Sequence, residues 1–315
     1  MLALLFPGQG SQEVGMGRDV YEASTAARAV FAAADAALGL PLSRLCFEGP
    51  EDELRRTEVQ QPAILATSVA LLRALQERTA LRPAFVAGHS LGEYTALVAS
   101  GALGFDEAVR LVHARGRFMQ ESVPEGRGAM AAVIGASPED VATACDYARA
   151  DTGRCVSPAN FNAPGQTVIA GDAVAVEVAC ARALQAGARR AIPLAVSAPF
   201  HCDLMAPAAE KLSAELAGAR FADAHPPVVT NVEAAPNADA SRFPELLTRQ
   251  VTAPVRFTES VRRLVELGVS HVLEIGPGSV LTGLVGRTAR GLARASLGRA
   301  SDLDAASRFA AEAGA

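Results

Sequence analysis

The sequence predicts an α/β protein in which a large α/β subdomain is interrupted by a small ferredoxin-like subdomain. Before Arg127, short apolar strands alternate with helical patterns, and the same alternation returns after Val196. Between Arg127 and Leu194 the order changes to strand, helix, two strands, helix and strand. Alternating strands and helices are typical of a parallel sheet, whereas the order βαββαβ is the split ferredoxin-like unit. We therefore expect residues 1–126 and 196–315 to form the large subdomain and residues 127–195 the small one.

The large subdomain begins with two short buried strands. The first, Leu2–Phe6, is an apolar run that ends at a Pro-Gly pair, and the second, Ala84–Ala87, follows a stretch with apolar residues at helical spacing. The helices expected around them are Gln61–Arg78, Glu93–Ser100 and Phe105–Glu121. Ser90 consequently lies at a turn that leads from a buried strand into a helix.

The inserted subdomain and the C-terminal part are predicted from the same kind of pattern. The elements expected in the insert are strand Ala129–Ile134, helix Pro138–Ala148, strands around Cys155–Ala159 and Gln166–Ala170, helix Ala173–Gln185 and strand Arg190–Leu194. After Val196, the strand His271–Ile275 and the apolar helix that follows its Gly-Pro-Gly turn are expected to complete the first sheet. The last twenty residues are expected to form a surface helix or a frayed tail.

Composition excludes several classes of function. A chain of 315 residues, half of them hydrophobic, can bury a large core. Its net charge of -5 provides no general field for nucleic acid or an anionic membrane. The five cysteines are widely spaced and form no metal-binding pattern, and no apolar run reaches membrane-spanning length. We expect a cytoplasmic protein that binds neither nucleic acid nor membrane, nor any metal.

Gly88-x-Ser90-x-Gly92 matches the nucleophile elbow, a strained turn that lifts a serine above a sheet. An ordinary glycine-rich turn is the alternative, but the strand before Ser90 and the helix after it favour the elbow. A serine hydroxyl needs a base to remove its proton. Among the five histidines, His201 is the best candidate because it lies in a loop that leaves the insert. We expect the other four to be structural.

Seven blocks of sequence together resemble the malonyl-CoA:acyl carrier protein transacylase family, over about residues 1–290. They are Phe6-Pro7-Gly8-Gln9-Gly10-Ser11-Gln12, Gln61-Pro62-Ala63, Gly88-His89-Ser90-Leu91-Gly92-Glu93-Tyr94, Ala114-Arg115-Gly116, Asn160-Phe161-Asn162-Ala163-Pro164-Gly165-Gln166, Pro199-Phe200-His201 and Glu274-Ile275-Gly276-Pro277-Gly278. Each block alone is weak, but seven in the family's order make the resemblance specific.

The resemblance implies a hydrolase-like α/β subdomain with an inserted ferredoxin-like subdomain and a site between them. It implies transfer of a malonyl group from malonyl-CoA to an acyl carrier protein through a covalent acyl-serine, in fatty-acid or polyketide synthesis. The partners would be malonyl-CoA and the carrier. We expect a monomer without a cofactor, since neither Gly8-x-Gly10 nor Gly276-x-Gly278 has the third glycine of a dinucleotide site.

The resemblance also assigns roles to individual residues. It makes Ser90 the nucleophile and His201 the general base and acid. The backbone N–H groups of Gln9 and Leu91 would form the oxyanion hole. The backbone carbonyl of Gln250 would orient the histidine, which gives a dyad with a carbonyl in place of a Ser-His-Asp triad.

Four further residues are expected to bind the substrate. Arg115 matches the arginine that receives the malonyl carboxylate, a bidentate geometry that lysine would not reproduce; the alternative is a helix-surface arginine. Phe200 would limit room for a branch on the acyl group. Gln61 and Asn160 come from two of the matching blocks, although Asn-x-Asn-x-Pro-Gly is also good turn chemistry, and we favour the turn for that segment.

Two rival functions remain open. An acyl hydrolase on the same scaffold would clear wrongly loaded carriers, but Arg115 favours a donor that carries a free carboxylate. A non-catalytic module that docks carriers would need neither Ser90 nor His201. Three arginine pairs are candidates for contact with an acidic carrier or the phosphates of coenzyme A, and the sequence does not select among them: Arg55-Arg56, Arg189-Arg190 and Arg262-Arg263.

Overall fold

A computed structural model describes residues 1–124 and 126–314 of the chain. The first elements are β1 (Leu2–Phe6), α1 (Arg18–Ala23), α2 (Thr25–Leu38), α3 (Leu42–Glu48), α4 (Glu51–Arg55), α5 (Thr57–Gln76), β2 (Phe85–Gly88), α6 (Gly92–Ala99) and α7 (Phe105–Ser122). The middle elements are β3 (Gly128–Ile134), α8 (Pro138–Thr152), β4 (Val156–Ala163), β5 (Gln166–Asp172), α9 (Ala173–Gln185) and β6 (Arg190–Pro193). The last elements are η1 (Asp203–Met205), α10 (Ala206–Gly218), β7 (Val228–Val229), β8 (Pro236–Asn237), η2 (Ala240–Arg242), α11 (Phe243–Gln250), α12 (Phe257–Glu266), β9 (His271–Ile275), α13 (Val280–Thr288), β10 (Ala293–Leu297), η3 (Ala300–Asp302) and α14 (Leu303–Glu312).

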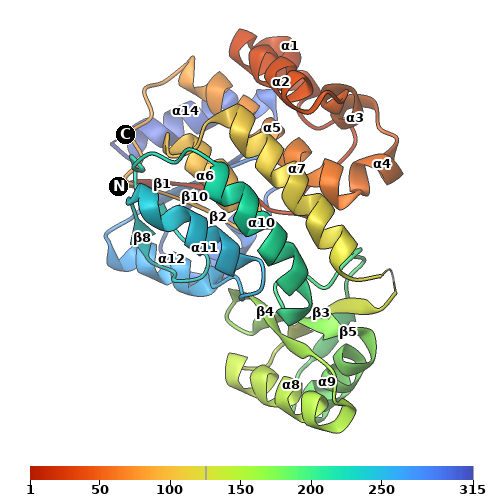
Figure 1. Ribbon diagram of the computed structural model, residues 1–315. Coiled ribbons are helices and arrows are strands. Elements are labelled where there is room, and N and C mark those ends of the chain that lie inside the picture. The colour runs from red at the N-terminus through yellow and green to blue at the C-terminus, as the bar shows by residue number, and fades with distance from the viewer. Residues whose placement is uncertain (125, 315) are drawn as a thin grey trace.

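These elements form two separate sheets. The larger has the order β10-β9-β1-β2-β7-β8, and all neighbouring strands except β7 and β8 run parallel. The smaller, β4-β5-β3-β6, is antiparallel and forms from a continuous stretch of chain. Figure 1 shows this sheet with α8 and α9 at the end of the molecule opposite α1 and α2. The predicted α/β class with an inserted βαββαβ unit is confirmed.

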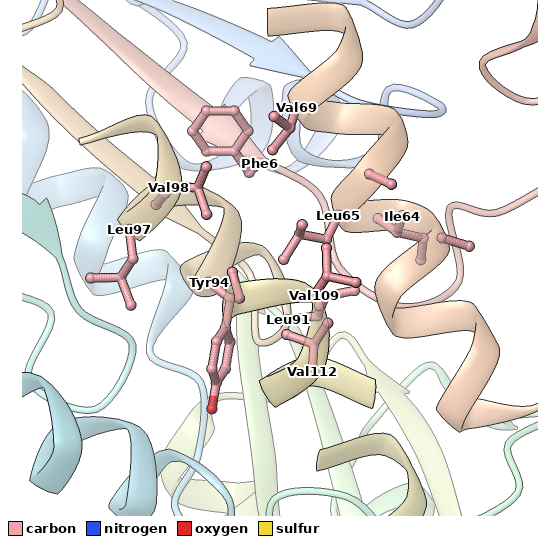
Figure 2. Close-up of a cluster of buried hydrophobic side chains, with 14 of the residues drawn as sticks. Phe6, Ile64, Leu65, Val69, Leu91, Tyr94, Leu97, Val98, Val109 and Val112 are labelled. Carbon is pink, nitrogen blue, oxygen red and sulfur yellow. The ribbon is translucent and has the colours of Figure 1, made fainter. Parts of the chain in front are cut away.

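The central strand β1 is buried on both faces, as expected of a parallel strand covered by helices. Its Leu2, Leu4 and Phe6 pack with residues of α5, α6 and α7. Its Ala3 and Leu5 face the opposite side, toward α12 and α13. Figure 2 shows part of the first cluster, with Phe6 beside Val69 of α5 and Val98 of α6. This packing fixes the end of β1, where the chain leads directly into Gln9.

The smaller sheet also has two different faces. Ala131 and Val133 of β3 pack against α8 and α9, which cover one side. Met130 and Ala132 alternate with them and join the core of the larger body. Because side chains alternate along a strand, one face of β3 packs against α8 and α9, and its other face lies toward the larger body.

Helix α5 begins earlier than the sequence pattern predicts and contains a proline. Pro62 has no N–H, so the carbonyl of Glu58 four residues earlier loses its helical partner. His113 Nδ1 lies 2.8 Å from that carbonyl oxygen and replaces the missing bond. The helix therefore continues through Pro62, back to Thr57, and ends at Gln76 before the predicted Arg78.

The prediction of a surface helix or a frayed tail for the last twenty residues was incomplete. The segment starts within β10, which pairs with β9 as the edge of the larger sheet. Helix α14 then buries Leu303, Ala306 and Ala310 against the core. Seven of these twenty residues are alanine, so the apolar face was narrow and easily mistaken for that of a solvated helix.

Candidate active site

Ser90 lies immediately after β2 on a sharp turn that glycines make possible. A Cβ on Gly88 would lie 1.9 Å from the carbonyl carbon of Gly92, and one on Gly92 would lie 2.1 Å from the carbonyl oxygen of Phe6. Ser90 itself has φ of 52°, in the left-handed region, which costs on the order of 1–3 kcal/mol for a residue with a Cβ. The surrounding structure holds this conformation. The N–H of Ser90 donates to Asn231 Oδ1 at 2.6 Å, and Asn231 Nδ2 donates to the Gly88 carbonyl at 2.6 Å.

The His201 imidazole faces the Ser90 hydroxyl. Its Nε2 lies 2.7 Å from Ser90 Oγ, and its Nδ1 lies 2.8 Å from the carbonyl oxygen of Gln250. A carbonyl can only accept, so Nδ1 carries the proton and Nε2 offers its lone pair to the hydroxyl. Gln250 is the last residue of helix α11, so the carbonyl that orients His201 lies at a helix terminus.

The environment keeps His201 neutral. Burial, and next the positive charge of Arg115, lower its pKa from 6.5 to about 3, while the Gln250 carbonyl opposes this shift. His89 adds a smaller effect in the same direction as burial. The imidazole is therefore unprotonated at neutral pH, the state that a general base requires.

Arg115 reaches the site from α7 and is 2% exposed, unlike the exposed Arg110 and Arg117 of the same helix. Its Nη1 donates to Gln61 Oε1 at 2.7 Å. Its Nη2 donates to Gln250 Oε1 at 2.9 Å and to Ser90 Oγ at 3.0 Å. Its Nε has no hydrogen-bond partner among the described residues. A buried guanidinium that bonds only neutral groups and lies beside the Ser90 hydroxyl can receive an anionic ligand.

Two residues that the sequence did not single out connect this site. Glu93 Oε2 accepts from Gln250 Nε2 at 2.7 Å and from the Asn231 N–H at 3.1 Å. Burial raises the pKa of the Glu93 carboxyl to about 7, against the effect of these donors and of Arg115. Glu93 lies in the matching block around Ser90, three residues after it, which was an available signal. Asn231 had none, because it is distant in the sequence and in no motif.

A cavity of about 450 Å³ opens beside Ser90 and His201. Its walls contain the following residues: Gln9, Gly10, Gln12, Arg55, Gln60, His89, Ser90, Arg115, Met119, Met130, Asn160, Leu194, Ala195, Val196, Ser197, Phe200 and His201. Among the residues that the sequence proposed, Gln9, Asn160 and Phe200 thus face the cavity together with Ser90, Arg115 and His201. Gln61 and Gln250 are not wall residues: Gln61 bonds the wall residue Arg115, and Gln250 bonds Arg115, His201 and Ser90. Leu91 is buried next to Ser90.

The proposed oxyanion donors are available in the geometry. Neither the Gln9 N–H nor the Leu91 N–H makes a hydrogen bond within the described part of the chain. Gln9 follows the end of β1, and Leu91 follows Ser90 at the end of β2, and these two strands are neighbours in the sheet. Both N–H groups therefore lie at the same edge of the larger sheet as Ser90.

The segment that begins at Asn160 differs from the favoured interpretation. Asn160 and Asn162 lie within strand β4, not in a turn. The turn between β4 and β5 uses Gly165, whose φ is 71°. Asn162 Oδ1 instead lies 2.8 Å from His89 Nε2, whereas the imidazole that contacts the Ser90 hydroxyl is that of His201. A strand edge that approaches the larger body, through the Asn160 and Val255 bridge, outweighed the local turn preference.

The three arginine pairs occupy different places. Arg55 lies at the wall of the cavity with a side chain 67% exposed, and it pairs with Glu51. Arg190 is on the exposed edge strand β6. Arg263 pairs with Glu266 on α12. In the part of the chain that the structure describes, no helix is long and apolar enough to cross a membrane. The same part contains no cluster of three or more metal-binding side chains.

Comparison with protein families places most of the chain in one of them. Residues 3–308 match the family model described as "Acyl transferase domain". The chain is 49% identical to the malonyl CoA-acyl carrier protein transacylase of Escherichia coli (strain K12) over 304 residues, which cover 96% of this chain and 98% of that protein. It is also 49% identical to the enzyme of the same name from Bacillus subtilis (strain 168), over 92% of this chain and 91% of that protein.

Solved structures give the same result. One is the holo complex of a type II PKS acyl-carrier protein with its malonyl-transacylase, at a TM-score of 0.95 and 48% identity, covering 98% of this chain and 99% of that chain. Another is an acyl carrier protein S-malonyltransferase from Vibrio cholerae, at a TM-score of 0.94 and 46% identity, covering 96% and 99%. Both agree with this chain in fold over nearly its full length.

Proposed function

Because the chain belongs to the malonyl-CoA:acyl carrier protein transacylases within the acyl transferase family, we propose that it works through a malonyl ester on Ser90. The protein transfers a malonyl group from malonyl-CoA to the phosphopantetheine thiol of an acyl carrier protein. The observation that carries the covalent route is the contact of 2.7 Å between Ser90 Oγ and a His201 Nε2 that has a free lone pair.

In the first half-reaction, Ser90 Oγ attacks the thioester carbonyl carbon while its proton passes to His201 Nε2. The backbone N–H groups of Gln9 and Leu91 stabilise the oxyanion that forms, a contribution worth about 2.7–4 kcal/mol per donor in related chemistry. The carbon–sulfur bond then breaks, and the leaving thiolate takes the proton from His201. In the second half-reaction the carrier thiol gives its proton to His201 and attacks the ester carbonyl carbon. The bond from that carbon to Ser90 Oγ then breaks, and Ser90 Oγ takes the proton from His201.

Arg115 receives the malonyl carboxylate in this proposal. Its unpaired Nε, together with the Nη atoms, forms a planar donor set that matches a carboxylate. Phe200 at the wall restricts the space around the acyl group. The carboxylate also changes the reactivity of His201. It offsets the Arg115 charge that lowers the His201 pKa, so the base strengthens when a malonyl donor binds.

Arg115 also separates this function from an acyl hydrolase, since an unsubstituted acyl group gives the buried guanidinium no counter-charge. Incubation with malonyl-CoA and no carrier should give a stoichiometric malonyl adduct on Ser90, measured by intact and peptide mass spectrometry. The folded Ser90→Ala variant should give none. Turnover by that variant, or an adduct on another residue, would exclude Ser90 as the nucleophile. Release of free malonate at the rate of carrier loading would instead favour the hydrolase.

We also propose that the protein works in the cytoplasm. The support is that its five cysteines are all free thiols, as expected in a reducing compartment.

A further inference from the structure

Gln60 is a buried amide side chain that the mechanism above does not use. It lies on α5, is 3% exposed, and its Oε1 has no hydrogen-bond partner among the described residues. It is nevertheless part of the wall of the cavity. An unpaired buried carbonyl costs about 1–3 kcal/mol, and nearly all buried polar groups in folded proteins are paired. The partner of Gln60 is therefore expected to arrive with the ligand.

Gln60 lies between two fixed points of that wall. Three residues earlier on the same face of α5, Thr57 Oγ1 is 2.8 Å from the Oγ of Ser197, which is itself a wall residue. One residue later, Gln61 bonds Arg115, which contacts Ser90. Gln60 is thus placed between the segment around Ser197 and the reactive centre. A thioester arm that reaches Ser90 along this stretch of wall passes Gln60.

The chemistry of the substrate indicates which part of the substrate can pair with Gln60 Oε1. An ionised malonyl thioester presents acceptor oxygens only, and Gln60 Oε1 is itself an acceptor. The malonyl group therefore cannot satisfy it. The pantetheine arm carries amide N–H donors, the first of them separated from the sulfur by two methylene groups. Coenzyme A and the prosthetic group of the carrier share this arm.

We propose that Gln60 binds the pantetheine arm, with Oε1 accepting an amide N–H, in both half-reactions. This inference rests on the proposed function, because it takes the thioester to be at Ser90. A side chain fixed on a buried helix would bind the arm that coenzyme A and the carrier's prosthetic group have in common. Gln60 thus contributes to recognition of both thiols, while Arg115 selects the acyl group.

The test compares Gln60→Met with the wild type on two malonyl donors, malonyl-CoA and the S-ethyl thioester of malonate, which has no amide. Methionine keeps the length of the side chain and removes its polar atoms. We expect kcat/KM for malonyl-CoA to fall about five- to tenfold, the size of one hydrogen bond, and the value for the S-ethyl donor to stay unchanged. Gln76→Met, an exposed position on the same helix, is the matched control and should alter neither.

Thermal unfolding supplies a second measurement. The free Gln60→Met protein should be at least as stable as the wild type, because no unpaired carbonyl remains in it, while coenzyme A should protect it less. An equal loss with both donors, or no loss with either, overturns the assignment of Gln60. A changed malonyl-to-acetyl ratio also overturns it, since the amide would then face the acyl group. The absence of a Ser90 adduct in the wild type with malonyl-CoA would contradict the proposed function instead.

Discussion

The two sheets contribute to the cavity in different ways. At the ends of β1 and β2, parallel strands bring the Gln9 loop and Ser90 to one edge, and the buried Asn231 side chain holds the backbone of Ser90. The smaller sheet contributes Met130 and Asn160 as wall residues, and the Asn160 side chain makes no hydrogen bond among the described residues. Parallel strand ends concentrate the chemistry, while the antiparallel sheet shapes the space in front of it. Variants on the two sides should accordingly differ greatly in effect.

The largest effect is expected for His201→Ala. Loss of a positioned base should lower the rate of Ser90 acylation by about 10²–10⁴-fold, measured by rapid quench and mass spectrometry with malonyl-CoA. His271→Ala, which changes the partly exposed histidine at the start of β9, is the control and should be acylated at the normal rate. Near-normal acylation by His201→Ala would assign the proton transfer to another group.

Arg115→Ala should change the choice of acyl group more than the reactivity of Ser90. Removal of one partner of a buried ion pair costs on the order of 3–5 kcal/mol, which corresponds to about a hundredfold or more for malonyl-CoA. Acetyl-CoA should not lose and should gain, because Arg115 no longer lowers the pKa of His201. The measurement is kcat/KM for both donors, with Arg117→Ala, an exposed arginine on the same helix, as control. An unchanged malonyl-to-acetyl ratio would remove Arg115 as the carboxylate receptor.

Stability should depend on pH through His201. Its pKa is about 3 in the folded protein and 6.5 in the unfolded chain, so the unfolded state binds the extra proton between these values. The free energy of unfolding should therefore fall as the pH drops below 6.5. His201→Gln should flatten this part of the curve, which denaturant unfolding at pH 7 and pH 5 can measure. Parallel curves for variant and wild type would mean that His201 is not held neutral by the fold.

Glu93→Gln should give a smaller loss, of about tenfold in acylation, because its oxygen accepts two N–H groups that position Gln250 and Asn231. An amide in this place puts a donor where an acceptor is needed, at about 1–3 kcal/mol. Glu93→Asp keeps the carboxylate but shortens the side chain, so it tests whether the charge alone is sufficient. If the effect is on position, kcat should fall for both malonyl-CoA and acetyl-CoA, with the Ser90 adduct unchanged in location. Full activity of Glu93→Gln would contradict this role.

Asn160→Ala should have the smallest effect, a change of about two- to threefold in kcat/KM at most, since its amide holds none of the reacting groups. The same steady-state assay with malonyl-CoA and carrier measures it. A loss as large as that of Arg115→Ala would place part of the chemistry on the smaller sheet and remove the contrast between the two sides.

Local patterns in the sequence were sufficient for much of the fold. The apolar run Leu2–Phe6 became β1 at the same bounds, and the helix Ala173–Gln185 became α9 at the same bounds. The role of the glycines around Ser90 could also be predicted from the local sequence. Backbone segments approach each other so closely there that a Cβ would not fit. Helix periodicity, strand alternation and a tight turn depend on neighbouring residues, so they can be read along the chain.

The sequence left open which distant groups meet. Gln250 donates to the Ser90 carbonyl across 160 positions and accepts from Arg115 across 135, and nothing in the local pattern encodes such pairs. The adjacent residues Gln60 and Gln61 show the same limit of the sequence. They are the same residue type on the same helix, yet one carbonyl holds Arg115 and the other is unpaired at the cavity wall. Successive helical residues point in directions about 100° apart, so their roles follow from what packs against each side of α5.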